Sequence, residues 1–151
     1  RRKISGYSDN GKERYRKKMI KSIVKDTFFL QIPCSRASLE DEGILQDLKD
    51  TLLAHKESCV GLAANMIGYS KCMIIISPGI VMINPVIVKA SGEYNTVEGC
   101  LSLPGTRQTK RYKKITVQYE DEHFHKKTGV YTGSVAQIIQ HETDHLHGIL
   151  I

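Results

Sequence analysis

The chain has 151 residues, of which 40% are apolar and 25% are charged, a composition typical of one soluble globular domain. No apolar stretch approaches the roughly 20 residues that a membrane-spanning helix needs, and no signal-peptide pattern is present, so we expect a cytoplasmic location and no membrane partner. The formal charge of +6 arises wholly from residues 1–18, since the remaining residues hold equal numbers of basic and acidic side chains; nucleic acid is therefore not expected as a partner.

The leading segment, residues 1–18, is basic, rich in turn formers and nearly free of apolar side chains. Such a composition cannot bury enough apolar surface to offset the entropy of ordering. We predict that it is a disordered arm, or an extension added to the natural chain. Residues 19–151 are predicted to form a single catalytic domain.

The first predicted element of that domain is an amphipathic helix over about 38–55, which opens with a Ser38–Asp41 capping pattern. Residue types that favour strands follow, and a second helix begins after Thr132 or Ser134. The predicted strands cover 72–77, 81–88, 115–119 and part of 126–133. This order predicts an α+β fold in which antiparallel or mixed sheets surround the second helix.

The second helix carries the sequence QHETDHLHG, residues 140–148. His141 and His145 are four residues apart, so their imidazoles lie on one helix face and can reach one metal ion. Glu142 projects to the side, where it can act as a general base towards a water beside the metal. Apolar residues flank the motif, and burying ionisable side chains is costly unless they are paired or bind a metal. The pattern therefore favours a metal site.

A hydrolytic metal site of this type needs three protein ligands and one open position. The third ligand must come from upstream, because few residues follow the motif. The candidates are His123 and His125, in a loop-like acidic stretch, and Cys100 in the sequence EGCLS. A thiolate binds zinc or ferrous iron well alongside two imidazoles.

Three segments, GLAAN (61–65), EGCLS (98–102) and QHETDH (140–145), together resemble the signature segments of peptide deformylases, in the same order along the chain. The resemblance covers about 19–151. It implies metal-dependent removal of the formyl group from N-formylmethionyl peptides or nascent chains, in transient association with the ribosome. It also implies one divalent metal ion per chain, commonly Fe²⁺, with Zn, Ni or Co as substitutes.

The resemblance also implies a role for each site residue. Cys100, His141 and His145 would bind the metal, and Glu142 would be the base and proton shuttle. The remaining residues would contact the substrate: Leu101 through its backbone N–H at the developing oxyanion, Gly61 beside the bound peptide, and Arg107 near the mouth of the cleft.

The resemblance fails at two positions of the first segment, where Cys59 replaces the family's first glycine and Met66 replaces a glutamine. Met66 stands where the family has a glutamine that donates to the oxyanion, and a thioether cannot donate. We therefore expect weakened activity. Two alternatives remain at this stage: a metalloamidase acting on another N-acyl peptide, and a catalytically silent relative that binds peptide N-termini.

Overall fold

The computed structural model describes residues 2–3, 15–16 and 19–151. A five-stranded antiparallel sheet, in the order β3-β4-β5-β6-β7, forms most of the domain. Each strand pairs with the next one along the chain, so the sheet is a meander. The strands are β3 (Gly61–Ala63), β4 (Met73–Ile76), β5 (Ile80–Cys100), β6 (Leu103–Glu120) and β7 (Lys126–Thr132).

The helices lie before, within and after this sheet in sequence. In the part of the chain that the structure describes, three are α-helices: α1 (Thr27–Leu30), α2 (Glu42–Ala54) and α3 (Gly133–Leu146). Two are short 3₁₀ turns: η1 (Leu39–Asp41) and η2 (Ala64–Ile67). Within the described residues, no helix is long and apolar enough to cross a membrane.

Helix α2 forms where the sequence predicts it. The backbone N–H of Ser38 donates to the Asp41 carboxylate at 2.9 Å, which fixes the start of the helical segment. Leu45, Leu48 and Leu52 are buried on one face, as their spacing requires.

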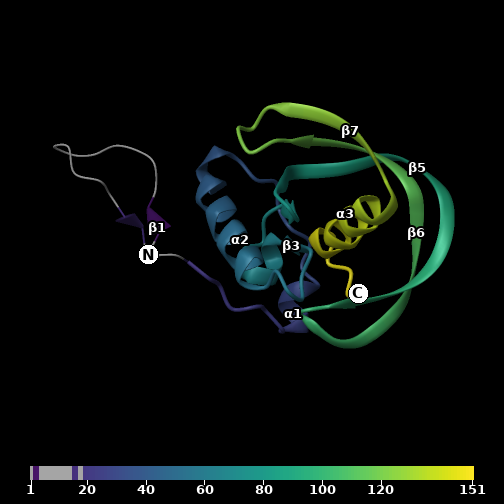
Figure 1. Ribbon diagram of the computed structural model, residues 1–151, viewed down its shortest axis with the longest axis horizontal. Coiled ribbons are helices and arrows are strands. Elements are labelled where there is room, and N and C mark those ends of the chain that lie inside the picture. The colour runs from purple at the N-terminus through teal and green to yellow at the C-terminus, as the bar shows by residue number, and fades with distance from the viewer. Residues whose placement is uncertain (1, 4–14, 17–18) are drawn as a thin grey trace.

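Helix α3 lies in the concave side of the curved sheet, with β5, β6 and β7 bending around it (Figure 1). Its fully buried residues include Ala136 and Ile139, while Val135 and Ile138 pack at the edge of the core. The predicted α+β fold, with an antiparallel sheet around the second helix, is confirmed.

Strands β5 and β6 are much longer than the predicted segments. Residues 88–96 are exposed or half-exposed, and they lack the alternation of apolar and polar residues that marks a half-buried strand. The sequence therefore did not predict a strand through them. Their strand conformation is maintained by an antiparallel ladder with β6, which runs from Lys89↔Thr116 to Gly99↔Thr106.

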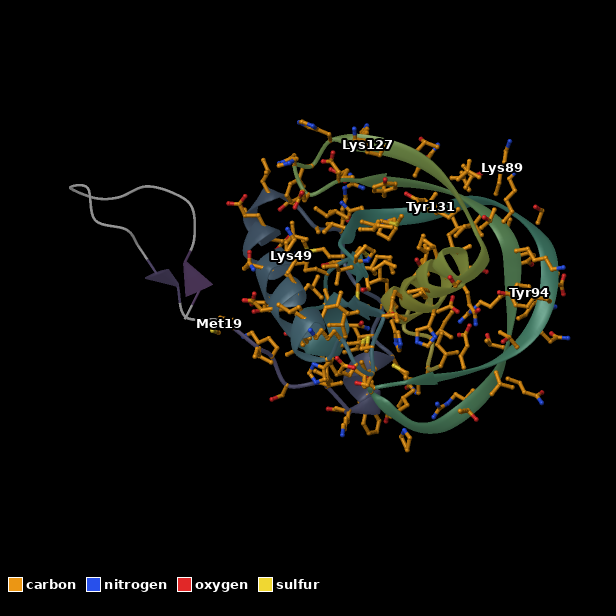
Figure 2. The ribbon with its side chains drawn as sticks, viewed as in Figure 1. Met19, Lys49, Lys89, Tyr94, Lys127 and Tyr131 are labelled. Atoms are coloured by element: carbon orange, nitrogen blue, oxygen red, sulfur yellow. The ribbon has the colours of Figure 1, made fainter. Side chains whose placement is uncertain are left out.

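The predicted disordered arm, residues 1–18, lies largely outside the described residues. Within it the structure describes two short strands, β1 (Arg2–Lys3) and β2 (Tyr15–Arg16), which pair antiparallel with each other. From Met19 onward the backbone contacts the domain: the Met19 N–H donates to Asp50 and the Lys21 N–H to Thr51 (Figure 2 marks Met19).

Candidate metal centre

Three ligand-type side chains converge where the β5–β6 hairpin meets α3. The Sγ of Cys100 lies 3.2 Å from Nε2 of His145, which in turn lies 3.3 Å from Nε2 of His141. Among the described residues, this is the group of His, Cys and acidic side chains whose ligand atoms all lie within 4.8 Å of one another. The structure therefore brings Cys100, and neither His123 nor His125, to the two helical histidines.

Two local structures place these side chains. Cys100 is the last residue of β5, directly before the turn at Leu101 and Ser102 and beside a register irregularity in the ladder. The N–H of Ser102 donates to its sulfur at 3.4 Å. His141 and His145 are one turn apart on α3, with ring centroids 5.0 Å apart.

The spacing of these atoms suits a metal ion. With metal–nitrogen bonds of about 2.0–2.1 Å, two imidazole nitrogens in a tetrahedral site lie about 3.3 Å apart, and a thiolate lies about 3.5 Å from each. The observed separations of 3.3 and 3.2 Å are close to these values. The three side chains therefore fit a single divalent metal as a Cys-His-His set.

Glu98 orients one of the histidines. It is buried, and its Oε1 accepts from Nδ1 of His141 at 2.8 Å and from Nη2 of Arg111 at 2.7 Å. Its Oε2 accepts from Nε of Arg111 and from Nε2 of Gln137. With Nδ1 of His141 engaged as a donor, Nε2 keeps its lone pair for a metal.

The same contacts keep Glu98 ionised. Burial raises its pKa, but the hydrogen bonds from His141, Arg111 and Gln137, together with the Arg111 charge, outweigh burial and lower the pKa to about 2. Arg111 is itself buried and also binds Asp144 at 2.7 Å. Sequence spacing did not reveal these roles of Glu98, Arg111 and Asp144; the one available signal was the acid two residues before Cys100.

Glu142 is the buried carboxylate of the site. It is 4% exposed, and its Oε1 has no hydrogen-bond partner among the described residues. Burial, assisted by the negative charge of Glu98, raises its pKa from 4.5 to about 7 against the opposing effect of His141. A carboxyl group in this range can both accept and return a proton.

A cavity of about 480 Å³ opens beside these residues. Its walls include residues from η2, β3, the β5–β6 turn and α3. Among them are Cys59, Gly61, Met66, Leu101, Gln137 and Ile138, together with Cys100, His141 and Glu142. Cys59 is unpaired and donates from its thiol to the Gly61 carbonyl at 2.9 Å.

Gly61 lies in close contact with α3. A Cβ at this position would lie 2.8 Å from Cγ2 of Ile138 and 3.1 Å from Oε2 of Glu142. Met66 is 1% exposed, and its Sδ accepts from the N–H of Ala63 at 3.5 Å. The thioether therefore occupies the cavity wall at the position where the resemblance implies a donor.

Three other residues singled out from the sequence do not line the cavity. Arg107 is on β6, where its guanidinium donates to the Pro104 carbonyl at 3.2 Å; it is not among the residues that line the cavity. His123 and His125 are exposed in the β6–β7 turn, where their backbone N–H groups donate to Asp121.

The fold and the site together define the class of protein as a metallohydrolase. A curved antiparallel sheet surrounds an HExxH helix, and a cysteine from a hairpin faces the two histidines of that helix. The comparisons with known proteins identify the family. The polypeptide deformylase family model matches residues 20–151. The chain belongs to the peptide deformylase family.

Individual relatives agree. A peptide deformylase from Clostridium beijerinckii is 52% identical over 136 residues, covering 88% of this chain and all of that protein. One from Carboxydothermus hydrogenoformans is 41% identical over 111 residues, covering 71% of this chain and 72% of that protein.

Solved structures extend the comparison to the fold. A peptide deformylase from Legionella pneumophila has a TM-score of 0.78 at 32% identity, covering 87% of this chain and 83% of that one. A Met-Ala-Ser-bound class I type b enzyme from Acinetobacter baumannii has a TM-score of 0.80 at 27% identity, covering 89% and 97% of the two chains. These relatives establish a hydrolase of this family and do not favour the two alternative functions.

Proposed function

We propose that this chain hydrolyses the N-formyl group of N-formylmethionyl peptides at a centre in which Cys100, His141 and His145 hold one divalent metal. The observation that carries the assignment is the convergence of these three side chains beside the buried carboxylate of Glu142, at the wall of a cavity. Family membership supports the reaction.

When bound, the metal would act as a Lewis acid that activates water and polarises the formyl oxygen. Glu142 would remove a proton from the attacking water and return it to the leaving amine, and its raised pKa suits both steps. The backbone N–H of Leu101, on the cavity wall beside Cys100, would donate to the developing oxyanion.

The substrate backbone is proposed to lie along β3. This strand is at the end of the sheet, paired on one side with β4, and its first residue, Gly61, faces the cavity. An extended peptide can hydrogen-bond to such an edge as an added strand. The structural relative that binds Met-Ala-Ser supports a peptide ligand of this size.

We further propose that the metal in the cell is Fe²⁺, and that the chain acts in the cytoplasm on nascent polypeptides, with transient association with the ribosome. The cysteine and two histidines suit ferrous iron as well as zinc.

The test is an assay on anaerobically iron-loaded full-length protein with formyl-Met-Ala-Ser and its acetyl counterpart. We expect formate release from the first and at least a hundredfold slower hydrolysis of the second. Glu142→Gln should keep its metal and lose about 10²–10⁴ in turnover, because an amide cannot shuttle the proton. Equal rates on the two peptides would indicate a broader amidase, and no formate release from fully metal-loaded protein would reject the proposal.

A further inference from the structure

Gln137 is a polar side chain in the wall of the substrate cavity. It lies on α3 one turn before His141, next to Ile138, and all three residues line the cavity. Its Nε2 donates to Oε2 of Glu98 at 2.9 Å.

The contact with Glu98 fixes which end of the Gln137 amide is bound and which end is left free. Glu98 accepts four hydrogen bonds, two from Arg111, one from His141 and one from Gln137. An ionised carboxylate can only accept, so the NH₂ group of Gln137 must face it and the carbonyl oxygen must point away.

The carbonyl oxygen, Oε1, is available to a ligand. It has no hydrogen-bond partner among the described residues, and it is not one of the buried unpartnered polar atoms of the described chain. It is therefore an accessible acceptor, held in one orientation by the bond from Nε2 to Glu98.

Substrate geometry brings the first side chain of the peptide near the part of α3 that carries Gln137. In an N-formyl peptide the Cα of the first residue is bonded directly to the formylated nitrogen. With the formyl group at Cys100, His141 and His145, the first side chain must enter the cavity within a few bond lengths of the α3 turn formed by residues 137–141.

We propose that Gln137 is a specificity-determining residue that makes the pocket for the first side chain amphipathic. Its Oε1 accepts a hydrogen bond from the end of an unbranched, donor-bearing side chain, so the chain also takes N-formylglutaminyl peptides. Methionine and glutamine have similar length and no branching, and they differ at the end of the side chain, where only glutamine donates. This inference rests on the proposed deformylase function.

The experiment compares kcat/KM for formyl-Met-Ala-Ser and formyl-Gln-Ala-Ser in the metal-loaded wild type and in Gln137→Met. Removing the acceptor should raise the Met-over-Gln preference about three- to tenfold, the usual effect of one neutral hydrogen bond. Gln118→Met, the same change at an exposed position of β6, should leave the ratio unchanged. Gln137→Leu serves as a second variant.

Binding of the deformylated peptides Met-Ala-Ser and Gln-Ala-Ser, measured by calorimetry, gives a readout independent of turnover. A shift in the binding ratio that matches the shift in the kcat/KM ratio supports the inference. If neither formyl peptide is hydrolysed, that result rejects the proposed function alone, and the shift in the binding ratio still supports the inference. An unchanged ratio in Gln137→Met overturns the inference. Equal losses on both peptides also overturn it, because Gln137 would then act only by holding Glu98.

Discussion

The metal-binding geometry depends on a few buried side chains. Glu98 orients His141, and the N–H of Ser102 contacts the sulfur of Cys100, so two of the three candidate ligands are each held by a neighbour that is not itself a candidate ligand. Such outer contacts align ligand atoms before a metal arrives. The ligand set is therefore open to test one residue at a time.

Cys100→Ala should lose most of its bound metal, because two imidazoles alone hold a divalent ion poorly. Elemental analysis of the purified variant is the measurement. Cys59→Ala is the matched control, since Cys59 lines the same cavity but is not one of the three converging side chains. Full metal content in Cys100→Ala would remove the cysteine from the ligand set.

Met66→Gln should raise deformylase turnover. The loss of one oxyanion donor typically costs about 10²–10³ in turnover, and glutamine restores a donor with little change in side-chain length. KM should change less than kcat, because the donor acts mainly on charge that develops in the transition state. Steady-state kinetics on the two proteins with matched metal content decide the question; equal or slower turnover in Met66→Gln rejects the missing-donor explanation.

At the scale of elements, the site depends on the close approach of β3 to α3. Gly61 provides this approach, because any side chain there would meet Ile138 and Glu142. The strand thus contributes Gly61 to one wall of the cavity, while α3 contributes His141 and Glu142 to another.

Gly61→Ala should lower the free energy of unfolding by about 1–3 kcal/mol and reduce turnover, because the new methyl group must displace Ile138 and the Glu142 carboxylate. Thermal unfolding and kinetics measure the two effects. Gly43→Ala is the control: it lies on the exposed face of α2 with nothing within 4 Å of its new Cβ, and it should be neutral or stabilising by up to about 1 kcal/mol. Normal turnover in Gly61→Ala would show that the two elements separate without harm to the site.

The sequence predicted those elements whose side chains alternate between core and solvent. Helix α2 and the HExxH helix α3 are of this kind. The resemblance pointed to Cys100 because the signature segment around this residue is one continuous stretch of sequence. The full length of β5 and the Arg111–Glu98–Gln137 contacts were not predicted. They depend on pairing between residues far apart in the chain, and such pairing leaves no periodic pattern.

For the whole molecule, the charge distribution and the family match both divide the chain near residue 19. The excess positive charge belongs to residues 1–18, and the family match covers 20–151. The contacts of Met19 and Lys21 with α2 begin directly after this segment.

Removal of residues 1–18 should therefore leave the melting temperature, metal content and turnover unchanged. The segment has almost no apolar surface to bury, so its loss removes little stabilisation. Differential scanning calorimetry and elemental analysis of the two forms provide the comparison. A drop of several degrees in the truncated protein would show that the leading segment stabilises the domain.

The meeting of the β5–β6 hairpin with α3 has a consequence for metal supply. Cys100 and His145 are 45 positions apart in sequence, so an ion shared between them would act as a reversible cross-link that closes a long loop. Because such an ion would bind the folded chain in preference to the unfolded one, mass action would add about 2.7 kcal/mol of stability at a free metal concentration one hundred times the Kd. A cell short of that metal would then lose enzyme by proteolysis as well as by inactivity, which links the abundance of the protein to metal homeostasis.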